Sequence, residues 1–433
     1  MKLSTVLSSI LLFSGICILP QQSNAQIVEK SYVERILNTL ASDEMGGRHT
    51  LGPHIHQAAD FIAAEFRSIG LQPYAEENFR QTFHLTKITR EIAEVQWSNN
   101  KLTADNFLLI SNEPTIHWDK GSGIPIKYIK KDDDFAATFR ALAQAQEDVI
   151  VLVDPSFASY IKRFNRIYSR ENLVGALPEK GFTKAFILTE QLPGNYIIKC
   201  QNSANKIDLF NVAAVIPGKS KPNEYVVFSG HYDHIGIIKA DGQDSIANGA
   251  DDDASGTSAM IGLAKYYKKL NNNERTLIFV AFTGEEIGMY GSKYFSNNIN
   301  ADSVVAMINI EMIGKDSKFG PNSLYITGYD RSNLGELMQK NVANTAFTFH
   351  PDPYPQQNLF YRSDNAVLAA LGVPAHTFST SQIDKDGYYH TVKDEVRTLN
   401  IDNIMSSLEA IAIGAEGIVK GVQTPTRVEK LKD

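Results

Sequence analysis

Three apolar runs between residues 226 and 311 each end at side chains that commonly bind metals. Residues 226–228 lead to His231, residues 277–282 lead to Glu285 and Glu286, and residues 304–310 lead to Glu311. Continuous apolar runs are typical of strands buried within a parallel sheet. Because ligands of such α/β sheets bind beyond the carboxyl ends of the strands, the spacing predicts that these side chains meet at one edge.

An aspartate triplet at residues 251–253 adds to this constellation, because it directly precedes a helical stretch at residues 255–270. A lone histidine after a strand is usually structural, and a Glu-Glu pair is usually solvated; their joint placement with the triplet favours a metal site. Imidazole and carboxylate ligands suit zinc, and two cations about 3.5–4 Å apart are held by a shared carboxylate. One glutamate of the pair is then placed to act as a general base, so the pattern predicts a metal-dependent hydrolase.

The alternation of strands and helices predicts the fold class. Strands are expected at residues 213–216, 225–228, 324–326 and 375–378, and helices at residues 32–40, 58–69, 255–270 and 403–419. We therefore predict a three-layer α/β/α sandwich with a mixed, largely parallel central sheet.

The segment from about residue 77 to residue 205 has a different texture. Short apolar runs are separated by turn-rich stretches, with one helical stretch at residues 134–145. We predict a mostly β insertion with its own core within a catalytic domain made of residues 26–76 and 206–433. A set of long loops folding over the main domain is the alternative. In either case a working hypothesis is that residues 77–205 cover the cleft and limit substrate size.

Residues 1–25 have the features of a signal peptide. Lys2 precedes an apolar run at residues 6–19, and Ser23 and Ala25 occupy the positions that a signal peptidase requires. The run is too short and too interrupted for a membrane anchor, which needs about 20 apolar residues. We expect export to the periplasm or beyond, cleavage before Gln26, and no stable membrane insertion afterwards.

Composition excludes some classes of protein. The net charge is −7 without a long basic run, which argues against nucleic acid as a partner. Cys200 is the one cysteine beyond the predicted signal peptide, so no internal disulfide can form in the processed chain. Nothing in the sequence indicates the oligomeric state.

The motifs resemble a known family. They lie in order at residues 230–233, 249–256, 279–291 and 309–314, and at Tyr389-His390-Thr391 with Asp394. Together they resemble the co-catalytic zinc exopeptidases that include bacterial leucyl aminopeptidase, aminopeptidase Y and glutamate carboxypeptidase. The resemblance covers most of the chain after Asn205 and the two helices near the N-terminus.

The resemblance implies a role for each matching residue. His231 and Glu311 would hold one zinc ion, and Glu286 and His390 a second. Asp252 would bridge the two ions, and the bond from Asp252 to Asp253 is often cis in this family. Asp233 would orient the ring of His231, and Glu285 would be the general base.

One departure from the family pattern leaves the number of zinc ions open between two and one. Glu311 stands where the family most often has aspartate, so its longer side chain must fold back to keep a ligand distance near 2.0–2.2 Å. His234 and His376 are expected to be structural or rim residues. Residues 363–365 (Ser-Asp-Asn) are expected to support the site.

The predicted activity is hydrolysis of a peptide substrate by an aminopeptidase. Zinc would lower the pKa of a water molecule, and Glu285 would take its proton and pass it to the leaving amine. Two alternatives remain: a glutaminyl cyclase that uses one zinc for acyl transfer, and a binding protein that keeps the fold without activity. Intact Glu285 and the full ligand set favour hydrolysis.

Overall fold

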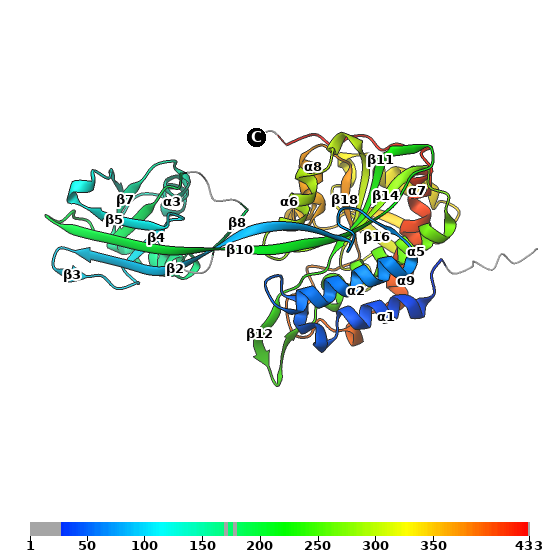
Figure 1. Cartoon of the computed structure of the whole chain (residues 1–433), viewed down its shortest axis with the longest axis horizontal. Coiled ribbons are helices and arrows are strands. Elements are labelled where there is room, and N and C mark those ends of the chain that lie inside the picture. Colours follow the sequence, from blue (N-terminus) through cyan, green and yellow to red (C-terminus); the bar gives the residue numbers. More distant parts are fainter. Residues whose placement is uncertain (1–26, 169–171, 176–179, 432–433) are drawn as a thin grey trace, which may run out of the picture.

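The protein consists of a sandwich-like body and a smaller unit held away from it on a long two-stranded ribbon (Figure 1). A computed structural model describes residues 27–168, 172–175 and 180–431. The predicted signal peptide lies outside these residues. Within the described part of the chain, no helix is long and apolar enough to cross a membrane.

The body is built on a mixed sheet. Its strands follow the order β17-β16-β18-β15-β11-β14-β10. In chain order they are β10 (Tyr196–Ile216), β11 (Lys221–His231), β14 (Arg275–Phe282), β15 (Val304–Ile310), β16 (Ser323–Ile326), β17 (Thr348–Pro351) and β18 (Ala375–Ser379). The four central strands β14, β11, β15 and β18 are parallel, whereas β10 and β16 flank them in the antiparallel direction. The parallel part contains the three apolar runs of the sequence.

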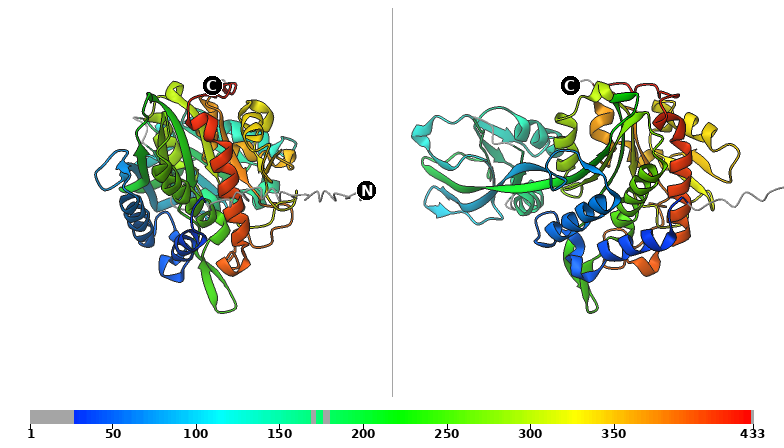
Figure 2. Two further views of the ribbon diagram at one scale, coloured as in Figure 1. Left: turned by 90° about the vertical axis from the view of Figure 1, so that its right-hand side faces the viewer. Right: turned by 45° about the vertical axis from the view of Figure 1, so that its right-hand side comes forward.

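Helices cover both faces of this sheet, as Figure 2 shows. One face carries α1 (Lys30–Leu40), α2 (His54–Ile69), α5 (Gly256–Leu270), α7 (Leu334–Asn341), α9 (Ile401–Gly414) and the short α10 (Glu416–Val419). The other face carries α6 (Tyr290–Asn297) and α8 (Asn365–Ala370). The predicted three-layer α/β/α class is therefore confirmed.

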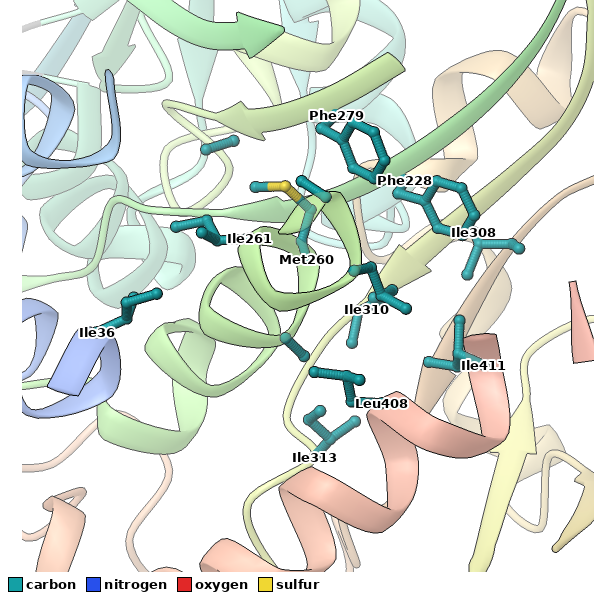
Figure 3. Close-up of a cluster of buried hydrophobic side chains, with 14 of the residues drawn as sticks. Ile36, Phe228, Met260, Ile261, Phe279, Ile308, Ile310, Ile313, Leu408 and Ile411 are labelled. Carbon is teal, nitrogen blue, oxygen red and sulfur yellow. The ribbon is translucent and has the colours of Figure 1, made fainter. Parts of the chain in front are cut away.

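The larger core lies between the sheet and α5 (Figure 3). Met260 and Ile261 of α5 are fully buried with Phe228 of β11, Ile308 of β15 and Leu408 of α9. Burial of such apolar side chains contributes about 1.5–3 kcal/mol each. The core therefore holds the carboxyl ends of β11 and β15 against the start of α5, where the predicted metal ligands lie.

The second unit is joined to the body by β2 (Arg80–Trp97), which pairs with β10 along 17 residue pairs. Its own sheet has the order β4-β9-β7-β6, made of Phe107–Ile110, Lys184–Leu188, Val149–Val153 and Ile126–Ile129. Helices α3 (Phe135–Gln144) and α4 (Ala158–Tyr168) pack on one face of that sheet. The sequence predicted one helix here. The second, α4, has apolar residues at 161, 164 and 168, a helical spacing that the prediction missed. β10 is continuous across the predicted boundary at residue 205.

The remaining strands are short. They are β1 (Gln72–Pro73), β3 (Asn100–Lys101), β5 (Thr115–Asp119), β8 (Asn172–Val174), β12 (Gly236–Asp241) and β13 (Asp244–Ala247). β12 and β13 form a hairpin that projects from the body directly after the first metal-binding motif (Figure 1).

Candidate metal centre

The structure gathers the predicted ligands into two groups that share Asp252. His231, Asp252 and Glu311 form one group, and Asp252, Glu286 and His390 form the other together with His234. Within each group, one potential ligand atom of every residue lies within 4.8 Å of the others. Side chains as far apart in the chain as positions 231 and 390 therefore meet at the carboxyl edge of the sheet.

The first group is held by strand ends. His231 is the last residue of β11, and Glu311 directly follows β15. The ring of His231 has its Nδ1 atom 3.0 Å from the main-chain oxygen of Asp233, and its Nε2 atom lies 3.1 Å from Asp252 Oδ1. A hydrogen bond from Nδ1 to that carbonyl leaves Nε2 directed at the shared carboxylate.

Asp233, predicted to orient the ring of His231, contacts that ring through its main chain. Its main-chain oxygen, rather than its carboxylate, is in hydrogen-bond contact with His231; the carboxylate oxygen Oδ1 is 3.8 Å from the ring. The carboxylate instead accepts hydrogen bonds from Thr50 Oγ1 at 2.6 Å and from the main-chain N–H of Glu285 at 3.2 Å. Asp233 thus links the first motif to the loop that carries Glu285 and Glu286.

The second group is built on loops. Glu286 lies in the turn after β14, where Gly284 has a φ of 71° that favours glycine. His390 lies in the loop before α9, with its Nε2 atom 3.0 Å from Glu286 Oε2 and 3.2 Å from Asp252 Oδ2. The ring of Tyr389 stacks on His390 with 3.9 Å between centroids. The stacking limits the positions that the His390 ring can take.

The three aspartates of the triplet have different partners. Asp251 accepts a hydrogen bond from Gly314 N at 2.7 Å, and Asp253 accepts from His231 N and Met312 N, each at 3.1 Å. These bonds tie the turn to the ends of β11 and β15. Of the three carboxylates, that of Asp252 lies against the imidazole rings of His231 and His390, and the Asp252-Asp253 peptide bond is cis as expected.

Two cations, the buried Arg48 and the partly exposed Lys315, hold the segments of the site together. Arg48 is fully buried and donates to four main-chain oxygens, those of Leu40, Tyr232, Asn248 and Gly249, at 2.5–2.9 Å. Lys315 lies 2.6 Å from Asp386 and 3.5 Å from Asp251, so it joins the His390 loop to the triplet.

The donor set fits divalent cations. Burial is the main cause that raises the pKa of Glu285 well above its usual value and the pKa values of Glu311 and Asp364 to about 7. The Nε2 atoms of His231 and His390 are buried without a hydrogen-bond partner, although carboxylates lie close to them. Unpaired imidazole nitrogens facing a surplus of carboxylates fit a zinc site.

A cleft of about 310 Å³ opens beside the two groups. Glu285, Glu286, Glu311 and His390 form part of its wall together with mostly apolar and hydroxyl side chains. Those side chains are Met289, Met312, Tyr325, Thr327, Leu359, Ser363, Thr377, Ser379, Ser381, Ile383 and Tyr389. None of the described residues within 77–205 (77–168, 172–175 and 180–205) lines the cleft.

Comparison with known proteins agrees with this geometry. Residues 211–413 match the family model described as "Peptidase family M28". Over these residues, the M28 region, the chain is similar to that family. The M28 region contains every ligand that the sequence predicts.

Individual relatives share the M28 region. A probable zinc metalloprotease of Pyrenophora teres f. teres is 35% identical over 113 residues, which are 26% of this chain and 23% of that protein. A probable leucine aminopeptidase of Trichophyton verrucosum is 28% identical over 223 residues, which are 49% of this chain and 57% of that protein. The match therefore spans less than two thirds of either relative.

A solved aminopeptidase from Aneurinibacillus sp. strain AM-1 has the same fold. The TM-score is 0.55 at 17% sequence identity, with 94% of this chain and 96% of that chain covered. The likeness therefore includes segments outside the M28 region.

Sequence reasoning set aside some residues that the structure brings to the site. His234 was expected to be structural or a rim residue, but it is fully buried and lies 2.6 Å from Glu286. The other histidine, His376, lies apart from both groups, with its ring nitrogens close to Thr327 O and Ser332 Oγ. Asp364 is buried, and Ser363 accepts a hydrogen bond from Asn309 at 2.8 Å. The position of His234 beside two motif residues was the signal available in the sequence.

Proposed function

We propose that this chain is a zinc-dependent exopeptidase, with aminopeptidase action on peptides as its activity. The observation that carries the proposal is the pair of ligand groups sharing Asp252, with Glu285 beside them at the wall of a cleft. The shared carboxylate suits two zinc ions, each held by at least one histidine and one further carboxylate. Bound zinc supplies a Lewis acid and lowers the pKa of a water ligand to near neutrality.

Glu285 is the residue we assign to proton transfer. Its main chain is fixed by the hydrogen bond from its N–H to Asp233, while its carboxylate lines the cleft. It takes a proton from the attacking water and later gives it to the leaving amine. Burial favours the protonated acid that the second step needs, whereas nearby cations favour the carboxylate that the first step needs.

The surplus of carboxylates supports recognition of the amino terminus of a peptide. A free α-ammonium group entering the cleft meets Glu285, Glu286 and Glu311. A positive group is favoured there because the carboxylates of the cleft wall outnumber its one arginine, Arg362. The apolar part of the wall, which includes Met289, Leu359 and Ile383, suits an apolar side chain of the residue to be released.

The test compares wild type with Glu285→Gln on free and N-acetylated peptides, with zinc content measured for both proteins. We expect release of N-terminal residues from free peptides only, and a fall in kcat of at least about 100-fold for the variant. Zinc content should be unchanged. Equal hydrolysis by the variant would refute the role of Glu285, and formation of pyroglutamate from an N-terminal glutamine peptide would identify a cyclase instead.

We also propose export, which rests on residues 1–25 as a signal peptide. N-terminal sequencing of the protein recovered outside the cytoplasm should begin at Gln26. A start at Met1 in that fraction would contradict the proposal.

The covering role of the second unit stays a prediction. Tyr290, which follows the Glu286 loop, donates a hydrogen bond to Leu173 O in β8 at 2.7 Å, and this is a direct link between β8 and the body. Replacing residues 98–195 with a short turn between β2 and β10 tests the role. The shortened protein should accept longer peptides, and an unchanged length preference would count against a covering function.

A further inference from the structure

We infer that the two ligand groups of the metal centre bind zinc with unequal affinity. The group that contains Glu286, the Glu286 half, has four donor side chains because His234 belongs to it. The group that contains His231, the His231 half, has three. The inference rests on the proposed zinc-dependent function and extends it to the order in which the sites fill. His234 stands three residues after His231, in the turn between β11 and the projecting hairpin. Its side chain is fully buried.

The ring of His234 faces the second ligand group. Its Nδ1 atom lies 2.6 Å from Glu286 Oε1 and 3.7 Å from Asp252 Oδ2. The ring also meets that of His390 in an edge-on arrangement with 5.6 Å between centroids. His234 is therefore in contact range of every other member of its group.

The surrounding backbone keeps the ring in this position. The main-chain N–H of His234 donates to Arg48 O at 3.2 Å. Gly249, with a φ of 56°, packs so closely that a Cβ atom there would lie 2.5 Å from the ring. Because both the main chain and the space around the ring are fixed, His234 cannot turn away from Glu286 without a shift of the turn.

The distances allow one ion to contact all four side chains. Zinc is bound by nitrogen and carboxylate oxygen at about 2.0–2.2 Å, so two ligands of one ion are at most about 4.4 Å apart. The four separations between a histidine nitrogen (His234 or His390) and a carboxylate oxygen (Asp252 or Glu286) are 2.6 to 3.7 Å, within this limit.

The other half has a smaller donor set. His231, Asp252 and Glu311 supply three side chains. Zinc sites with four protein ligands are generally closed and structural, whereas catalytic sites have three and keep one position for water or substrate. We expect the Glu286 half, which includes His234, to bind zinc first and tightly. The His231 half should bind zinc more weakly and be the half that exchanges ligands.

The experiment is a zinc titration of the metal-stripped full-length protein against a competing chelator. Wild type is compared with His234→Ala, His234→Asn and His231→Ala. Asparagine keeps a hydrogen-bond donor for Glu286 but is a poor zinc ligand, so it separates ligation from positioning. His350→Ala is the control, because His350 stacks on Phe319 and belongs to neither ligand group.

Wild type should bind two zinc ions with dissociation constants that differ by at least about 10-fold. Both His234 variants should weaken the tight site by about 100-fold or more, since even loss of an outer partner of a ligand costs about 10–100-fold. His231→Ala should weaken only the loose site, and His350→Ala should change neither.

Retention of the tight constant in His234→Asn would overturn the inference and leave His234 as a residue that positions Glu286. Two equal sites in wild type would overturn it as well. Far-UV circular dichroism of the metal-stripped variants separates loss of a ligand from loss of the fold. If His234→Ala does not fold, the zinc titration of His234→Asn alone tests the inference. A protein that binds zinc as expected but hydrolyses no peptide would refute the proposed function and not this inference.

Discussion

Replacement of Arg48 by methionine should destabilise the body of the protein while leaving the second unit unaffected. The guanidinium donates to four buried carbonyl oxygens that belong to α1, to the turn after β11 and to the segment before the aspartate triplet. Methionine fills a similar volume but donates nothing. Gly249 O also accepts a hydrogen bond from Ala254 N at 3.2 Å, so three acceptors, those of Leu40, Tyr232 and Asn248, would lose the partner that the guanidinium supplies.

The magnitude follows from two opposing effects. An unpaired buried acceptor costs about 1–3 kcal/mol, so three cost roughly 3–9 kcal/mol. Against this, burial lowers the pKa of Arg48, so the folded state now carries a desolvation cost of several kcal/mol that the variant avoids. We expect a net loss of about 4 kcal/mol in the free energy of unfolding. Arg48→Lys, with three donors, should lose less.

Urea unfolding followed by far-UV circular dichroism measures this loss. Both tryptophans of the chain, Trp97 and Trp118, lie in the core of the second unit, so tryptophan fluorescence reports on that unit. The dichroism transition should move and the fluorescence transition should not. Arg397→Met is the matched control, because the Arg397 side chain is 72% exposed and should contribute less than about 1 kcal/mol. A loss below about 1 kcal/mol in Arg48→Met would refute the reasoning.

Three further perturbations have expected outcomes. Gly256→Ala should lower the free energy of unfolding by at least about 2 kcal/mol and weaken zinc binding, because the added Cβ would lie 2.1 Å from Ile310 O. The control is Gly194→Ala, where the added Cβ has no atom within 4 Å and should leave stability unchanged in the same urea assay. Burial lowers the pKa of His376 to about 4 from 6.5, so the unfolded chain takes up a proton first as pH falls. The free energy of unfolding should therefore drop by about 3 kcal/mol between pH 6.5 and 4, and His376→Asn should lack that part of the decline. Zinc at 100 times its dissociation constant should stabilise the folded state by about 2.7 kcal/mol in thermal unfolding. Asp252→Asn weakens the shared ligand, so the same zinc concentration should stabilise this variant less. Equal stabilisation of variant and wild type would contradict the bridging role of Asp252.

Much of the body could be predicted from the sequence because its signals are local. Long apolar runs identified the buried parallel strands, helical spacing identified α1, α2, α5 and α9, and ordered motifs indicated which side chains would meet. The carboxyl end of a predicted strand places the residues around it at the edge of the sheet, to within a residue or two. His231 and Glu311 were for that reason placed correctly at the sheet edge before any contact was known.

Only the tertiary structure decided how the site is held together. Arg48 and Lys315 have no motif signal of their own, because their partners, carbonyls for Arg48 and carboxylates for Lys315, come from distant segments. The position of His234 depends on the turn after β11, which sequence periodicity does not describe. Local pattern determines which elements form, whereas the directions of side chains in turns depend on packing that is settled only when the whole chain has folded.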